Sequence, residues 1–229
     1  MTLSLLEGLY FPHPIDLMKE RKIEKLDLKK DLKHLYNPPA KAPVMLVVPP
    51  MNFLAIDGKG TPDGPDAVAA IEALYPVAYT LKFTIKKTQA IDYPVMPLEG
   101  LWWADDMASF SMGDKASWKW TYMIMQPELI TREMVDKAIV EVRRKKNPPA
   151  LGKMRFERFD EGPSAQIMYT GPYSAEGPTI KMLHDFIHEK GLVFDGLKQK
   201  HHEIYLGDPR RVAPEKLKTV IRQPARKPK

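Results

Sequence analysis

An internal repeat constrains the fold of this chain more than any other feature of its sequence. Segment 55–65 reads AIDGKGTPDGP and segment 168–178 reads MYTGPYSAEGP, so Gly58 aligns with Gly171 and Pro65 with Pro178 at one offset, 171 − 58 = 113 residues. In both copies a short apolar strand leads into a glycine turn and then a helix with proline in its first turn. The repeat predicts a duplicated α+β unit. Two such halves, paired about a pseudo-twofold axis, leave a cleft where small ligands commonly bind.

Length and composition fit a globular protein of this kind. The chain has 229 residues, of which 44% are hydrophobic, which is enough to bury a sizeable core. No apolar run reaches the length of a membrane span, and the first ten residues do not resemble a secretory signal. We therefore expect a cytoplasmic protein that does not bind membranes. The absence of cysteine excludes disulfides, thiolate nucleophiles and cysteine metal sites.

The net charge of +6 does not by itself indicate nucleic-acid binding. The excess lies in segment 143–146, at the expected end of a helix, and in the proline-rich tail 222–229. Cations at a helix C-terminus complement its dipole, and a basic tail is commonly a solvated end. No helix-turn-helix or RNA-binding pattern accompanies the charge, so we expect no nucleic-acid partner.

The pattern along the chain predicts three parts. Residues 1–42 form an N-terminal helical extension, residues 43–224 form a domain of two repeats (about 43–115 and 116–224), and residues 225–229 form a basic tail. An amphipathic helix around 132–143 is expected to cover the sheet. The other expected helices are 65–74 and 178–189, and the expected strands are 44–57, 79–86, 98–104, 118–126, 154–159, 166–170, 202–206 and 217–222.

Alternation assigns side chains of the strand around residues 118–126 to two faces. Because successive side chains of a strand point to opposite sides, Trp118, Trp120, Tyr122 and Ile124 share one face. The sequence therefore predicts an aromatic wall.

The same rule places Glu203 and Tyr205 together on one face of the strand 202–206, with Ile204 and Leu206 expected to pack on the helix side. Glutamate is disfavoured in strands, and burying its charge without a partner is costly. A solvated position on an edge strand, or a salt bridge to Arg210 or Arg211, would explain Glu203 without any function.

Several segments resemble the GyrI-like (gyrase-inhibitor-like) small-molecule-binding proteins, in the stand-alone branch with a double tryptophan. The resemblance runs from about residue 27 to residue 224. It is carried by FLAIDGKG at 53–60, YTLKF at 79–83, PLEGLWWA at 97–104, YMIMQP at 122–127, HHEIYLGDPRR at 201–211 and LKTVIRQP at 217–224. It implies two strand-helix-strand-strand repeats of the GyrI-like/SOUL type, which form an antiparallel sheet with helices on one face and a ligand cleft between the repeats.

The resemblance also implies roles for particular residues. Glu203 faces the cleft and attracts cationic or polar parts of aromatic ligands, with Tyr205 as its partner. Tyr173, in the loop after the first strand of the second repeat, contributes to the cleft wall. Trp102 and Trp103 are adjacent, so only one of them can face the cleft, and the sequence leaves open which one.

Some stand-alone members of this branch hydrolyse cyclopropane-bearing DNA-alkylating natural products, which suggests a cofactor-independent hydrolase. The aromatic wall would stack on a planar substrate, Tyr205 would donate a hydrogen bond to a conjugated carbonyl, and Glu203 would act as general base toward water. Two alternatives stay open. The protein binds or sequesters planar hydrophobic or cationic compounds without chemistry, or it is a scaffold whose cleft is filled by its own side chains, with Glu203 in a salt bridge.

Other motifs indicate no cofactor. His184 and His188 have the i, i+4 spacing of a zinc helix, but the sequence offers no third ligand, so no metal is expected. The glycine-rich segment 59–64 lacks the ending of a phosphate loop and the spacing of a dinucleotide-binding fingerprint.

Overall fold

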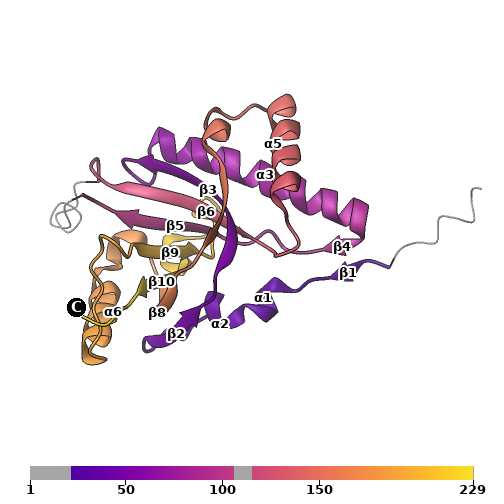
Figure 1. Ribbon diagram of the computed structural model, residues 1–229. Coiled ribbons are helices and arrows are strands. Elements are labelled where there is room, and N and C mark those ends of the chain that lie inside the picture. Colours follow the sequence, from indigo (N-terminus) through magenta and orange to yellow (C-terminus); the bar gives the residue numbers. More distant parts are fainter. Residues whose placement is uncertain (1–21, 106–114, 229) are drawn as a thin grey trace, which may run out of the picture.

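The computed structural model describes residues 22–105 and 115–228. Figure 1 shows a curled sheet with helices on both sides. The helices are α1 (Leu28–Asp31), α2 (Lys33–Tyr36), α3 (Pro65–Gln89), α5 (Arg132–Lys145) and α6 (Gly177–Glu189), with short 3-10 helices η2 (Pro149–Lys153), η3 (Tyr173–Ala175) and η4 (Pro214–Lys216). The strands are β1 (Glu24–Lys25), β2 (Val44–Val48), β3 (Met51–Lys59), β4 (Ile91–Asp92), β5 (Leu98–Trp103), β6 (Lys119–Gln126), β7 (Arg155–Phe159), β8 (Gly162–Thr170), β9 (His201–Tyr205) and β10 (Lys218–Pro224).

The eight-stranded sheet displays the repeat found in the sequence. Its order is β2-β8-β10-β9-β5-β6-β3-β7, and all neighbours are antiparallel. The unit β3-α3-β5-β6 occupies one half of the sheet and the unit β8-α6-β9-β10 the other. Within the two units β3, β6 and β5 are equivalent to β8, β10 and β9, and these strands follow one another in the same order from the two edges to the centre. The two repeats meet where β5 pairs with β9. The predicted duplicated α+β fold is confirmed.

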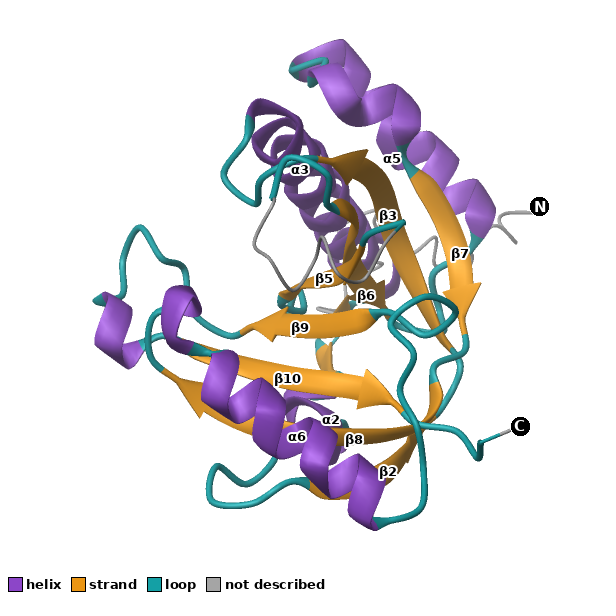
Figure 2. Cartoon of the chain, turned by 90° about the vertical axis from the view of Figure 1, so that its left-hand side faces the viewer, coloured by secondary structure: helices purple, strands orange, loops and turns teal. Residues whose placement is uncertain are grey.

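The helices of the two repeats pack on the same face of the sheet. Figure 2 shows α6 lying across β10 and β8, and its buried residues Leu183 and Ile187 share a core cluster with Ile167 and Ile221. By the 113-residue offset, Leu54 of β3 is the equivalent of Ile167 of β8. α3 packs against β3 and β6, the strands equivalent to the β8 and β10 that α6 covers. We call this the helix face. The opposite face is covered by α1 and α2, which pack into the larger core cluster.

α3 is longer than the sequence predicts, and the expected strand 79–86 is wrong. That segment alternates apolar and polar residues, as strands do, but its neighbours extend a helical period. Leu74, Val77, Leu81 and Ile85 are buried at spacings of three and four residues, with Pro76 inside the helix. Of the described helices, only α3 is long and apolar enough by length and composition to cross a membrane, a test that core helices also pass.

One further expectation needs correction. α5 does not cover the sheet but packs mainly against α3 through Val135, Ala138 and Val142. Of the predicted N-terminal extension the structure describes residues 22–42, which contain α1, α2 and β1, the strand that pairs with β4; residues 1–21 lie outside the described residues. The tail is attached to the domain as far as Arg226, which pairs with Asp195 at 2.9 Å.

A buried polar network joins α2 to the sheet on the face opposite the helix face. The Tyr36 hydroxyl donates to Glu99 (2.7 Å), and the His202 ring lies between Glu99 (3.0 Å) and Glu161 (2.8 Å). The Arg222 guanidinium donates to Glu161 (3.0 Å) and to a backbone carbonyl of α2 (2.6 Å). All five side chains are buried, so each charge depends on its partners rather than on water.

Candidate functional site

Strand pairing gathers the predicted aromatic residues at the junction of the two repeats. Gly100 of β5 lies between Tyr122 of β6 and Glu203 of β9, and Trp102 lies next to Trp120 on the adjacent strand. Because directly paired residues share a face, these side chains all project to the helix face. We define the aromatic site as Trp102, Trp118, Trp120, Tyr122, Tyr173 and Tyr205 with the carboxyl groups of Glu176 and Glu203.

The rings of the aromatic site touch one another in a continuous chain. Trp102 packs edge-on against Trp118 and Tyr122, with centroids 5.8 and 5.6 Å apart, and Trp120 stacks on Tyr122 at 4.7 Å. Tyr205 lies between Tyr122 (6.5 Å) and Tyr173 (5.7 Å). These spacings are those of favourable aromatic pairs, so the wall is preorganised.

The structure answers which of the adjacent tryptophans enters the site. The Trp102 Nε1 donates to the Tyr205 hydroxyl at 2.9 Å. Trp103 lies on the opposite face, where Lys200 Nζ sits 3.4 Å from its ring centroid. Trp103, expected among the ligand-binding residues, is therefore not brought together with the others, because neighbouring residues of a strand point to opposite sides.

Gly100 leaves the space in which the rings meet. A Cβ atom at this position would lie 2.8 Å from Trp102 Nε1, 3.0 Å from the Tyr205 hydroxyl and 3.2 Å from Tyr122. We expect Gly100→Ala to displace these rings and to lower the free energy of unfolding by about 1–3 kcal/mol. Urea denaturation and the tryptophan emission maximum would measure both effects.

Gly152→Ala is the matched control for this change. A Cβ atom at Gly152 has no heavy atom within 4 Å outside its chain neighbours, so this variant should lose no stability and keep the native emission maximum. An equal response of the two variants would show that Gly100 does not hold the rings apart.

Glu203 lies in the interior of the sheet, which rules out the edge-strand explanation. β9 is paired on both sides, and Arg210 and Arg211 pair with Asp208 rather than with Glu203. The Glu203 carboxylate is 2.9 Å from His201 Nε2, and its side chain is 15% exposed. Ile204 packs on the face opposite the helix face, so the sequence-based expectation that it lies on the helix side is wrong.

The surroundings of Glu203 keep it ionised. Burial raises the pKa of this carboxyl, but hydrogen bonds from His201 and Tyr205 lower it below its ordinary value. The Tyr205 hydroxyl thus donates to Glu203 and accepts from Trp102. This differs from the expected donation to a ligand carbonyl, because both hydrogen-bonding partners of Tyr205 are already present.

Glu176 is a second carboxyl group of the site, and the 113-residue offset of the repeat makes it the equivalent of Asp63. It occupies the N-cap position of α6 without a capping hydrogen bond from its side chain, is 4% exposed, and lies beside Glu203 and Thr219. Burial and the negative charge of Glu203 raise the pKa of Glu176 to about 9. One carboxyl of the pair is therefore ionised near neutral pH while the other holds a proton.

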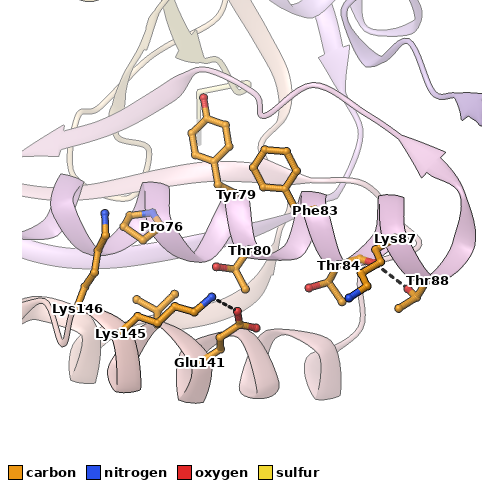
Figure 3. Close-up of a pocket in the computed structure, with 11 residues that line it drawn as sticks. Pro76, Tyr79, Thr80, Phe83, Thr84, Lys87, Thr88, Glu141, Lys145 and Lys146 are labelled. Atoms are coloured by element: carbon orange, nitrogen blue, oxygen red, sulfur yellow. Dashed lines mark hydrogen bonds and ion pairs between the residues drawn. The ribbon is translucent and has the colours of Figure 1, made fainter.

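A groove in the described part of the chain lies away from the aromatic site. This groove of about 600 Å³ runs between α3 and α5, with Thr80, Thr84 and the Glu141–Lys145 ion pair along it (Figure 3). Tyr79 and Phe83 point away from α5 in this view and are 46% and 58% exposed. The groove contains none of the residues of the aromatic site.

Within residues 22–105 and 115–228, no three histidine, aspartate or glutamate side chains are placed to hold a metal ion. His184 of the zinc-like helix packs its ring against Phe194, at 5.6 Å between centroids. The aromatic site itself contains carboxyl groups, phenols and indoles, which are suited to proton transfer and stacking.

Comparison with known proteins agrees with this architecture. The sequence profile of the GyrI-like small molecule binding domain matches residues 42–226. An uncharacterized conserved protein from Listeria innocua is similar in structure, with 39% identity, a TM-score of 0.81, and coverage of 88% of this chain and 100% of that chain. Two proteins from the same organism described as hydrolases are 37% and 39% identical, with TM-scores of 0.76 and 0.78; they cover 88% and 90% of this chain, and all of their own length is covered.

No curated protein sequence matches this chain. The match of the family profile to residues 42–226 includes all ten strands except β1 and all residues of the aromatic site. The chain therefore belongs to the family of GyrI-like small-molecule-binding domain proteins.

Proposed function

We propose that this protein binds planar hydrophobic molecules in the aromatic site and uses water to open a strained ring in them, such as a cyclopropane conjugated to a carbonyl. The observation that carries this proposal is the pair formed by an ionised Glu203 and a protonated Glu176 beside stacked rings. Two carboxyl groups whose surroundings separate their pKa values are the usual arrangement of a general base with a general acid. The similar Listeria proteins described as hydrolases support the same class of reaction.

The two carboxyl groups account for every proton of such a reaction. Glu203 takes a proton from water while the water oxygen bonds to a ring carbon, and the ring carbon–carbon bond breaks. Its electron pair moves through the conjugated system to the carbonyl oxygen, which takes the proton of Glu176. Because the two carboxyl groups are neighbours, a proton then returns from Glu203 to Glu176 and restores the starting state.

The aromatic residues hold the substrate in this scheme. Trp102, Trp120 and Tyr122 are only 3%, 1% and 3% exposed, so in this scheme they support the bound ring from beneath, and Tyr173, which is 38% exposed, stacks on the ligand at the accessible side of the site. Tyr205 orients Glu203 instead of contacting the carbonyl. In a cell, such a protein would act in the cytoplasm and remove genotoxic electrophiles before they reach DNA.

Glu176→Gln tests the role of the acid. We expect turnover to fall by about 100- to 10,000-fold, because an amide cannot supply the proton. The native enzyme should lose activity as the pH rises through about 9, since Glu176 then loses its proton, and the variant should lack that decline. Turnover measured by chromatography between neutral and alkaline pH would show both effects.

Asp63→Asn is the matched control for this experiment. Asp63 occupies the equivalent position in the first repeat but is exposed. This variant should keep native turnover and the alkaline decline. Persistence of the decline near pH 9 in Glu176→Gln would assign it to another group and remove Glu176 from the mechanism.

Binding without chemistry is the second candidate function. The observation that favours it is the His201–Glu203 contact of 2.9 Å, which can hold the carboxylate as an electrostatic anchor for a polar or cationic ligand. Here Glu203→Gln would weaken binding, whereas the hydrolase requires binding to persist while turnover is lost.

A further inference from the structure

We propose that Gln223 and His201 are positioning residues, in which the Gln223 amide keeps the His201 ring neutral with its proton on Nε2, directed at Glu203. This inference rests on the proposed function, because it explains how Glu203 is held ready to take a proton from water. Both residues act through Glu203.

Three side chains form a hydrogen-bonded row along β10 and β9. Gln223 Nε2 is 2.9 Å from His201 Nδ1, and His201 Nε2 is 2.9 Å from Glu203 Oε1. The antiparallel register pairs Arg222 with His202, so Gln223 and His201 follow as the next neighbours, on the helix face. Gln223 is fully buried, His201 is 4% exposed, and the Glu203 side chain is 15% exposed, so the row leads from the interior toward the ligand.

The chemistry of an amide determines the protonation of the ring. The Gln223 NH₂ group can only donate, so His201 Nδ1 must accept with its lone pair and carries no proton. The remaining proton sits on Nε2 and is donated to the carboxylate. The tautomer of a histidine is set by the hydrogen bond that its other nitrogen makes, which is the function of outer partners in many active sites.

A neutral donor is the useful partner for a general base. A neutral Nε2–H group fixes the orientation of the Glu203 carboxylate and leaves it with its full negative charge. A doubly protonated ring would form an ion pair that neutralises the carboxylate and weakens it as a base. A carboxylate at position 223 would favour the doubly protonated ring, so a glutamine at this position suits catalysis by Glu203.

Two substitutions test the inference. In Gln223→Glu, the new carboxylate should draw a second proton onto His201, and in Gln223→Met the loss of the amide donor leaves the Nδ1 lone pair free to take a second proton while Nε2–H stays on Glu203. Each change should reduce turnover by about tenfold or more, with a smaller effect on ligand affinity. Far-ultraviolet circular dichroism and urea denaturation identify any variant that fails to fold, and the other variant then decides.

The decisive readout is the ring-nitrogen NMR spectrum of the full chain labelled with nitrogen-15, which needs no substrate. The signals of His201 are assigned by their loss in His201→Gln. The native protein should show a neutral ring with its proton on Nε2 at neutral pH, and Gln223→Glu should show a doubly protonated ring.

Two results would overturn the inference. One is a native His201 that is doubly protonated or carries its proton on Nδ1, and the other is a ring unchanged by both substitutions. A native spectrum as expected, together with no turnover of any strained electrophile, would leave the positioning pair in place and reject the proposed hydrolysis, so the two failures are distinguishable.

Discussion

Replacing Glu203 with glutamine is expected to lower the turnover of a ring-opening substrate by about 100- to 10,000-fold while planar ligands still bind. Glutamine keeps the shape of the side chain and its place on β9, but it cannot take a proton from water. The packing of Trp102, Trp120 and Tyr122 against one another does not involve Glu203, so the aromatic site should keep its shape. Tryptophan quenching measures the affinity and chromatography of the same samples measures the turnover.

Glu189→Gln is the matched control, because Glu189 ends α6 on the exposed surface. It should match the native protein in both measurements. If Glu203→Gln instead loses affinity and the remaining bound ligand reacts at the native rate, Glu203 is an electrostatic anchor and not a base.

Replacing His202 with alanine is expected to lower the free energy of unfolding by about 3–5 kcal/mol. The ring bridges Glu99 and Glu161, which are 0% and 9% exposed, and its loss leaves two buried carboxylates with fewer partners. The network also fastens α2 to the sheet through Tyr36, so the N-terminal extension should detach more easily. Urea denaturation followed by circular dichroism measures the loss.

His188→Ala is the matched control for this substitution. His188 lies on the exposed side of α6, and its loss should change stability by no more than about 0.5 kcal/mol. A loss below about 1 kcal/mol in His202→Ala would mean that the buried network adds little to stability.

The same network predicts how stability depends on pH. Burial alone would lower the pKa of His202, but Glu161 and Glu99 raise it to about 9. The contribution of His202 to the free energy of unfolding is therefore complete below the unfolded pKa of about 6.5 and is lost as the pH rises through 9. Burial raises the pKa of Glu161, but His202 and Arg222 lower it to about 2. The contribution of Glu161 to the free energy of unfolding is therefore complete above pH about 4.5 and is lost as the pH falls through 2. Because its pKa is raised in the folded protein, Glu176 lowers the free energy of unfolding as the pH rises from about 4.5 to 9. Subtracting the free energy of unfolding of His202→Ala from that of the native protein at each pH isolates the contribution of the buried network.

Features that repeat or alternate in the sequence were predictable. The 113-residue offset led to the duplicated fold, and alternation in β6 and β9 placed Trp120, Tyr122, Glu203 and Tyr205 on consistent faces, since both signals depend only on local geometry. The strand expected at 79–86 was wrong because burial against the sheet and α5 overrode a local alternation.

The chemistry of the site depended on contacts that local patterns do not contain. The partners of His202 come from β5 and from the turn before β8, and Gln223 reaches His201 from β10, so no spacing along the chain indicates these contacts. Only the contact of His201, which is 4% exposed, with Glu203 has the i, i+2 spacing of residues on one strand face. The repeat aligns Glu176 with Asp63 at the start of an equivalent helix, which is the one feature of the sequence that points to Glu176. The raised pKa of Glu176 depends on its burial, which the exposed Asp63 does not share.

Whether the aromatic site opens a strained ring is tested by titrating the native protein with a planar compound that carries a cyclopropane conjugated to a carbonyl, in water enriched in oxygen-18. Tryptophan fluorescence reports binding, and chromatography with mass detection reports the product. We expect quenching together with a ring-opened alcohol that contains one oxygen-18 atom, formed faster than in Glu203→Gln. Quenching with recovery of the intact compound at saturation would contradict this expectation.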